Sequence, residues 1–404
     1  MSQKGKSNNP TLALIAVTLA FTFTFLSRYI WSPLMSTVSE EFGINSTQAG
    51  LYMSAFFAGY LVTQIPAGIL ADKYQPKLIL VICTVIGGIM TAAMALIHSY
   101  QAGLAVRVIT GISAGCVMAQ CSKVVAMLFK GPKRASAMGV VLASPPFGIT
   151  LAQTIGAPLN QSIGWRGTFL VVAAVAAIVV VLNLLWVPVF EKEPAKTDAN
   201  TSKKTGGFLD GLKGFFTNKQ QILLGISGFM FMFITVGFAT WTNRYVQSIG
   251  FTPVQGGMII TAYSIAGIVA SCLSGSIQNK AGISHRNFLV LTLSLIAVVT
   301  LIFSFQRSYG ALIGVAILYG AVSYLPSTHY TTSAMMLAGE KYTATAASTQ
   351  NLLFQLSSLI MPIVIGQVID KTGNYGLIWY IFFGVGIASI LFALLVKDDG
   401  KASK

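Results

Sequence analysis

Two arginines stand inside long apolar stretches of this sequence, Arg28 in the first stretch and Arg107 in the fourth. A charged group at membrane depth is costly unless it faces a cavity or an opposite charge. All 11 acidic residues fall in loops, in tails or at the ends of apolar stretches, so none can neutralise these arginines in mid-stretch. Because a guanidinium group can hold a carboxylate through two parallel hydrogen bonds, the pattern predicts that both arginines bind a small anion.

The helix face that carries Arg28 has further groups that suit an anion site. Thr24, Trp31 and Ser32 stand at i−4, i+3 and i+4 from Arg28, and residues at these spacings share one face of a helix. At about 1.5 Å per residue, Arg28 lies roughly 10 Å below the outer end of its span, and Arg107 lies at a similar depth. We therefore predict one site with two guanidinium groups, two hydroxyls and an aromatic wall. The alternative is that the arginines only pack helices together.

Four more residues are candidates for the same site. Lys123 follows Arg107 on one predicted helix but stands about 160° further round it, so both face one cavity only if the helix kinks. Tyr324 opens a proline-broken polar patch, and broken helices with hydroxyls suit a substrate pocket. His329 in that patch could titrate near neutral pH and carry the coupling proton, or it is simply hydrogen-bonded. Asn351 could add an uncharged hydrogen bond.

The composition places these residues in an integral membrane protein. Of the 404 residues, 54% are hydrophobic and 9% are charged, and the mean hydropathy is +0.72. Because a helix needs about 20 apolar residues to cross a bilayer, the sequence predicts an all-α fold of twelve transmembrane helices. The predicted spans are residues 11–35, 46–71, 77–98, 101–129, 135–159, 165–188, 221–246, 253–278, 286–306, 309–336, 343–369 and 375–396.

The chain divides into two related halves. A charged turn in the first half has a weaker copy in the second half, and such duplication is typical of repeat-built transporters. We predict an N-terminal six-helix bundle at residues 1–189, a cytoplasmic linker at 190–220 and a C-terminal six-helix bundle at 221–404. Apolar residues at helical spacing within the linker predict a short amphipathic helix, and a solvated linker is the alternative.

The net charge of +15 and the pI near 9.7 follow from the predicted topology. Lys and Arg concentrate in the segments that this topology places in the cytoplasm, so the positive-inside rule explains the charge without a nucleic-acid partner. We expect both termini in the cytoplasm and a multi-pass protein of the cell membrane. The four cysteines lie in apolar stretches without metal-ligand spacing, and no nucleophile and base stand together. We therefore expect no metal, no cofactor and no enzyme activity.

The charged turn of the first half resembles the cytoplasmic gating motif of the major facilitator superfamily, and the resemblance extends along the whole chain. The matching motif residues are Gly68, Asp72, Lys73 and Lys77. In that family the aspartate docks against a helix N-terminus or an arginine and holds the cytoplasmic side closed, which helix-end electrostatics make plausible. Gln75-Pro76 departs from the family pattern, and a plain charged turn is the alternative interpretation.

A narrower resemblance, to the anion:cation symporter branch of that superfamily, covers the first half. The matching stretches are Phe25-Leu26-Ser27-Arg28, Glu41-Phe42-Gly43 and Phe56-Phe57-Ala58-Gly59-Tyr60, and Asn351 also fits the pattern. The resemblance implies that Arg28 and Arg107 bind the carboxylate of the substrate. Ser27 and Ala114 stand where that branch has acidic residues that carry the coupling proton.

Together these observations predict a secondary transporter of a small organic anion, a carboxylate or a sugar acid, that works by alternating access. The missing acidic residues leave exchange against a counter-anion and proton symport both open. The alternative is a multidrug or amphipathic-compound exporter of the same superfamily, because 25 Phe and 14 Met could line an apolar pocket. The expected partners are the anionic substrate and the lipid bilayer, and we expect a monomer.

Overall fold

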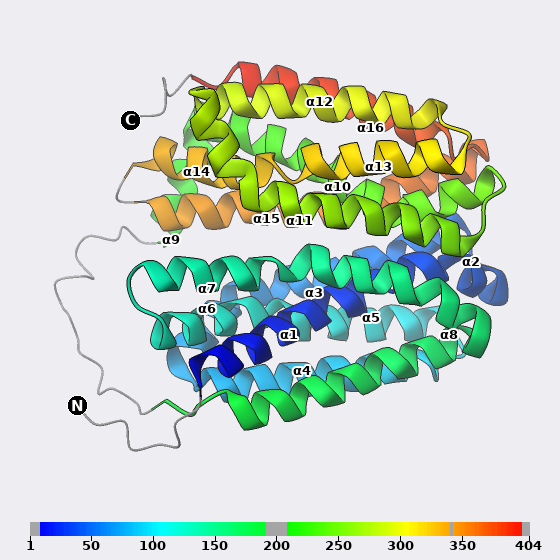
Figure 1. The fold of residues 1–404 in the computed structure, drawn as a ribbon, viewed down its shortest axis with the longest axis horizontal. Helices are drawn as coiled ribbons and strands as arrows, with labels where there is room; N and C mark the ends of the chain where they lie inside the picture. The colour runs from blue at the N-terminus through cyan, green and yellow to red at the C-terminus, as the bar shows by residue number, and fades with distance from the viewer. Residues whose placement is uncertain (1–8, 191–207, 340–341, 398–404) are drawn as a thin grey trace. The chain divides into compact units, whose positions relative to one another are not determined.

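The computed structural model describes residues 9–190, 208–339 and 342–397, and within them the chain forms α-helices joined by short turns (Figure 1). Helices are expected because backbone polar groups in a bilayer must find their hydrogen bonds within the chain. The helices of the first part are α1 (Pro10–Tyr29), α2 (Trp31–Phe42), α3 (Ser46–Lys73), α4 (Pro76–Met94), α5 (Tyr100–Gly115), α6 (Val117–Leu128), α7 (Pro132–Leu142) and α8 (Ser144–Trp186). The remaining helices are α9 (Phe208–Thr217), α10 (Lys219–Ser248), α11 (Pro253–Ala281), α12 (His285–Phe305), α13 (Tyr309–Ser323), α14 (Pro326–Ala338), α15 (Thr343–Thr372) and α16 (Leu377–Leu394).

The prediction of an all-α membrane protein is confirmed. Among the described residues, 10 helical segments are long and apolar enough to cross a membrane. One of them, Ser136–Trp186, has 51 residues and contains a backbone break at Gly164 (φ 73°, ψ 169°), so it accounts for two predicted spans. The helix α3, with 28 residues, covers a further predicted span. Large apolar side chains such as Val62 and Leu96 are exposed, as expected for residues that face lipid.

Several spans are broken into two helices near their middle. The first span changes from α1 to α2 at Ile30, and the fourth changes from α5 to α6 at Cys116. The fifth is broken between Leu142 and Ser144, where the Pro145-Pro146 pair follows. The tenth is broken before Pro326, as the proline in the polar patch predicts. These breaks release backbone carbonyls inside the bilayer, and those carbonyls need other donors.

The chain packs into two compact units that do not follow the order of the sequence. The first unit consists of Met1–Glu191, Ala239–Thr261 and Pro362–Gly373. The second unit consists of Lys192–Phe238, Ala262–Met361 and Asn374–Lys404. The first unit therefore holds the ends of α10, α11 and α15 together with the helices α1 to α8.

Close backbone contacts hold the end of α15 against α3 inside the first unit. A Cβ atom at Gly50 would lie 2.2 Å from the Pro362 carbonyl oxygen, and one at Gly366 would lie 2.6 Å from the Ser46 carbonyl oxygen. Only glycine allows this approach. The Asp370 carboxylate also accepts hydrogen bonds from the backbone N–H of Ser46 (2.7 Å) and of Thr47 (2.8 Å), so it caps the N-terminus of α3.

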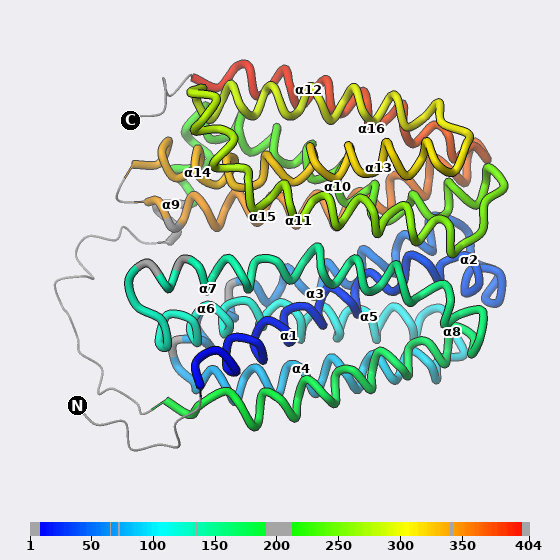
Figure 2. The backbone as a smooth tube through the Cα atoms, in the orientation of Figure 1, coloured from blue at the N-terminus to red at the C-terminus, as the bar shows by residue number. Residues whose placement is uncertain are grey.

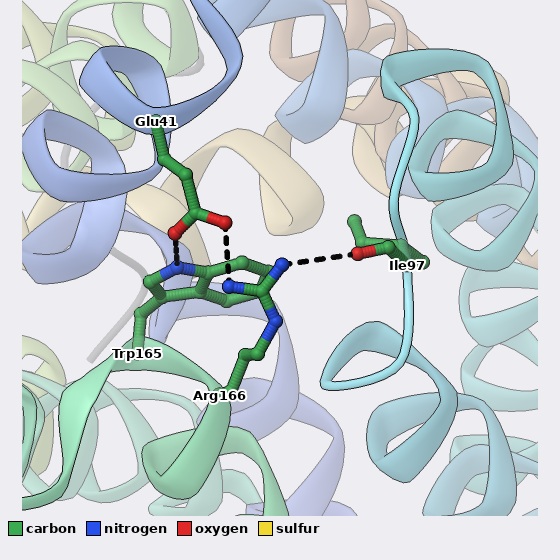
Figure 3. A network of polar contacts seen from close by, with 4 residues as sticks. All are labelled: Glu41, Ile97, Trp165 and Arg166. Carbon is green, nitrogen blue, oxygen red and sulfur yellow. Dashed lines mark hydrogen bonds and ion pairs between the residues drawn. The ribbon is translucent and has the colours of Figure 1, made fainter.

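A polar cluster at the end of α2 ties together three segments of the same unit (Figure 3). Glu41 accepts hydrogen bonds from Trp165 Nε1 (2.6 Å) and from Arg166 Nη1 (2.5 Å). Arg166 Nη2 donates to the Ile97 carbonyl at 3.3 Å, and its guanidinium carbon lies 4.2 Å from the Trp165 ring centroid. Because the Arg166 and Glu41 side chains are about a third or more exposed, we expect this ion pair to contribute little to stability.

Some sequence predictions concern residues outside this description, which are grey in Figure 2. The polar part of the predicted linker, residues 191–207, and both chain ends lie outside the described residues. The helix predicted within the linker is present as α9. Its Phe215 side chain is buried and its Phe216 side chain is exposed, which fits an amphipathic helix.

Candidate functional site

Arg28 lies in the last turn of α1, and its side chain is only 3% exposed. Four aromatic rings from α1 and α3 surround its guanidinium group, whose carbon lies 4.6–4.8 Å from each ring centroid. These rings belong to Phe25, Phe56, Phe57 and Tyr60, and we refer to them as the aromatic cage. A cation over aromatic faces is attracted by their quadrupoles, and the attraction grows when water is absent.

The hydrogen-bonding capacity of Arg28 is incompletely used. Its Nε and Nη2 atoms are buried and have no hydrogen-bond partner among the described residues, although the Tyr29 and Tyr60 side chains interact with the guanidinium group. Among the described residues, no acidic side chain forms an ion pair with Arg28. A buried charged donor without an acceptor is costly, and native proteins normally satisfy such groups. Arg28 therefore retains donors that could accept an anion as partner.

Arg107 is also buried, but its donors are occupied by backbone carbonyls. Its Nη1 and Nη2 atoms donate to the carbonyls of Ser27 and Arg28, each at 2.9 Å, and its Nε atom donates to the Tyr52 carbonyl at 3.2 Å. Carbonyls in the last turn of a helix lack partners within that helix, and α1 ends at Tyr29. The structure thus brings the two predicted arginines together, with Arg107 fastening the backbone that carries Arg28.

The three residues predicted on the Arg28 face make other contacts. The Trp31 indole N–H donates to the Ala49 carbonyl at 3.1 Å, and the Ser32 hydroxyl donates to the Thr240 carbonyl at 2.9 Å. Both residues follow the break at Ile30, so they belong to α2 rather than to the helix of Arg28. The Thr24 hydroxyl is buried and donates within its own helix, to the Phe21 carbonyl.

Lys123 belongs to α6, and its ammonium group lies at the C-terminal end of α3. Its ammonium group donates to the carbonyls of Ala71 and of Tyr74, the latter at 3.2 Å. A cation at the C-terminal end of a helix is favourable because the last carbonyls carry partial negative charge. In this structure Lys123 caps the helix that carries the predicted gating residues.

The gating residues occupy the last turns of α3 and the start of α4. Gly68 and Lys73 are exposed, and the Lys73 ammonium lies 5.6 Å from the Tyr74 ring centroid. Lys77 follows the first residue of α4. The side chain of Asp72 lies outside the described part of the structure. The gating role of these residues remains a prediction.

The candidates of the second half lie in the second unit. Tyr324 is the C-cap residue that follows α13. Its ring packs against that of Tyr263, with ring centroids 5.7 Å apart. Asn351 is exposed on α15. His329 is buried and makes hydrogen bonds through both ring nitrogens, to Ser274 Oγ (3.0 Å) and to His285 Nδ1 (2.8 Å).

The tautomer of His329 follows from its neighbours. The Ser274 hydroxyl donates to the Leu325 carbonyl, so it must accept a hydrogen bond from His329 Nε2. His329 Nδ1 is then an acceptor, and His285 Nδ1 carries the hydrogen between the two rings. This network gives His329 a structural role that links α11, α12 and α14.

Sequence reasoning did not select the aromatic cage as part of the site. All four rings stand in the stretches that carry the family resemblance, so their positions were visible in the sequence. Their contact with Arg28 depends on how α1 packs against α3, which no local pattern predicts. Two buried glutamines of the first unit, Gln120 and Gln153, were also missed, and neither side-chain amide has a hydrogen-bond partner within the part of the chain that the structure describes.

Comparison with known proteins identifies the family. The Major Facilitator Superfamily matches residues 17–362, and the chain belongs to this family of transporters, which is not an enzyme family. It is 23% identical over 371 residues to a hexuronate transporter of Bacillus subtilis (88% of this chain, 87% of the relative). It is 24% identical over 432 residues to a probable sulfoacetate transporter of Cupriavidus necator (100% and 99%). Its fold matches a crystal structure of a mutant of the nucleoside transporter NupG with a TM-score of 0.79, at 15% identity and with 95% and 99% of the chains covered.

Proposed function

We propose that this protein is a secondary transporter of a small organic anion, and that Arg28 binds the acid group of the substrate. The observation that carries the proposal is the buried guanidinium of Arg28, whose Nε and Nη2 atoms have no acceptor among the described residues. A carboxylate or sulfonate would supply both the acceptors and the opposite charge. The names of the two relatives, which specify a sugar acid and a sulfonated acid, support this class of substrate.

In this proposal the two arginines have different roles. Arg28 contacts the substrate, and the aromatic cage holds its guanidinium group away from water, which strengthens its interaction with an anion. Arg107 is a positioning residue, because its three backbone hydrogen bonds fasten the end of α1. Neutralisation of Arg28 by the substrate is the step that distinguishes the loaded carrier from the empty one.

The transport cycle is proposed to follow alternating access between two six-helix halves, residues 1–189 and 221–404. The gating residues of the α3–α4 turn would act at the cytoplasmic side, where both termini lie in a protein of the cell membrane. At the other end of α3, the Asp370 cap and the Gly366 contact would have to open when the outer side opens. The coupling mode stays open in this proposal. Ser27 and Ala114 stand where related symporters have proton-carrying acids, so the carrier would either exchange anions or use another group for the proton.

Ligand-induced stabilisation of the purified protein tests the proposed site. A ligand that binds only the folded state at about 100 times its dissociation constant stabilises the protein by about 2.7 kcal/mol. We expect galacturonate or sulfoacetate to raise the melting temperature of the wild type, and neutral galactose to leave it unchanged. Arg28→Lys keeps the charge but loses the two-pronged donor, so the shift should fall strongly, and Arg28→Met should abolish it.

The exposed cation Lys371 provides a matched control for the loss of one positive charge. Lys371→Gln should keep the full ligand-induced shift. An equal shift in wild type and Arg28→Met, or stabilisation by amphipathic cations in place of acids, would overturn the proposal. Uptake into proteoliposomes then separates the two coupling modes, because unlabelled internal acid drives exchange whereas an inward proton gradient drives symport.

A further inference from the structure

The second unit contains a cavity that is separate from the Arg28 site. It has a volume of about 170 Å³ and lies among the first turns of α10 and α12 and the last turns of α14 and α16. Most of its wall is apolar, and Leu224, Leu289 and Val396 are buried there. The cavity therefore offers an apolar trough at one end of four membrane-spanning helices.

Two cations line this trough, Arg286 at the start of α12 and Lys397 after the end of α16. Arg286 Nη2 donates to the Leu394 carbonyl at 2.9 Å, and the Lys397 backbone N–H donates to Gln220 Oε1 at 2.6 Å. Both positions are thus fastened to a neighbouring helix. None of the described residues that line the cavity is acidic, so the cavity has a net positive charge.

An amphipathic helix next to the cavity suits a position at the boundary between lipid tails and headgroups. The amphipathic helix α9 lies at the same end, where the ring of Phe215 lies close to Gly225 of α10 and the Asn218 amide donates to the Leu337 carbonyl at 3.5 Å. Exposed Phe216 on α9 is the kind of side chain that enters a membrane surface. The abundance of Lys and Arg in the turns at this end places it on the cytoplasmic side by the positive-inside rule.

We propose that this cavity binds an anionic phospholipid of the inner leaflet, with the phosphate between Arg286 and Lys397 and one acyl chain in the apolar trough. Basic pockets between helices on the cytoplasmic side are suited to such lipids, because the phosphate meets positive charge while the tail stays in an apolar wall. A small soluble anion would satisfy the two cations but would leave the apolar wall exposed. The proposal does not depend on the transported substrate.

Lipid binding to the purified, delipidated full-length protein tests this site. We would add phosphatidylglycerol or phosphatidylcholine in mixed micelles and follow bound lipid by native mass spectrometry and the melting temperature by fluorescence. We expect saturable binding of one phosphatidylglycerol with a higher melting temperature, and no equivalent effect of phosphatidylcholine. Arg286→Gln and Lys397→Gln should each weaken binding roughly five-fold.

Two further variants distinguish lipid binding in the cavity from a general effect of charge or folding. Lys280→Gln removes an exposed cation of the same unit that does not line the cavity, and it should leave binding unchanged. Met336→Glu places a carboxylate at an exposed position of the cavity wall and should repel the lipid without removing a buried side chain.

Equal binding of both lipids, or equal loss in Lys280→Gln, would show that lipid only solvates the protein surface and would overturn the proposal. A shift produced by inorganic phosphate alone would indicate a simple anion site instead. If the lipid fails to bind because the residues that follow Lys397 occupy the cavity, truncation after Lys397 would restore binding, and that result would also overturn the proposal for the complete chain.

Discussion

Replacement of Arg107 by methionine should destabilise the protein more than the same replacement of Arg28. Methionine keeps much of the side-chain volume but removes the donors to the carbonyls of Ser27, Arg28 and Tyr52. A buried acceptor left without a donor costs about 1–3 kcal/mol, so the losses at the Ser27 and Arg28 carbonyls amount to about 2–6 kcal/mol. The Tyr52 carbonyl lies inside α3 and keeps its helical donor. Removal of a buried charge offsets part of this cost, and we expect a net loss of about 3 kcal/mol or more.

Unfolding by sodium dodecyl sulfate in mixed micelles, followed by tryptophan fluorescence, measures the difference. The free energy of unfolding of Arg107→Met should fall well below that of Arg28→Met. The Nε and Nη2 atoms of Arg28 make no hydrogen bond to the described residues, so their removal in Arg28→Met breaks none. Binding of the acid should weaken in both variants, in Arg28→Met through a lost contact and in Arg107→Met through a displaced α1. If Arg107→Met kept the wild-type unfolding free energy but lost binding, Arg107 would be a substrate contact and our assignment of roles would be wrong.

Three further predictions concern the two ends of α3. Asp370→Ala removes the cap of that helix and should lower the free energy of unfolding by about 1 kcal/mol in the same assay; an unchanged value would mean that water replaces the carboxylate. Gly366→Val should lower the melting temperature sharply, because its Cβ atom would lie 2.6 Å from the Ser46 carbonyl oxygen, whereas Gly310→Val, where a Cβ atom meets nothing within 4 Å, should not. Lys123→Met should cost about 1 kcal/mol while the affinity for the acid stays at the wild-type value, and a large loss of affinity would return Lys123 to the substrate site.

Charged side chains contact both ends of α3. Its N-terminus is capped by Asp370 from α15, and its C-terminal end receives Lys123 from α6. Both ends of this helix are therefore held by charged groups from distant parts of the sequence. In the proposed transport cycle, the contact of Asp370 with the N-terminus of α3 opens while the contact of Lys123 with its C-terminal end stays in place.

The sequence by itself determined the class of protein and pointed to two cations, Arg28 and Arg107, inside the apolar stretches. Hydropathy specifies membrane-spanning helices because about 20 apolar residues are needed to cross a bilayer, and this requirement is local. The prediction for Arg28 rested on the absence of acidic residues in the apolar stretches, which is a property of composition that needs no coordinates. The proline of the polar patch, Pro326, likewise predicted a break, because proline removes a hydrogen bond from the interior of a helix.

Only the tertiary structure decided which polar side chains still have unused hydrogen-bonding capacity. Arg107 and Lys123 are cations in apolar stretches just as Arg28 is, yet their donors meet carbonyls at the ends of α1 and α3. The polar groups of Trp31 and Ser32 are also occupied, by the carbonyls of Ala49 and Thr240. The positions of these helix ends, and of the rings that enclose Arg28, depend on contacts between helices far apart in the sequence. Periodicity describes one helix at a time, so it could not assign these partners.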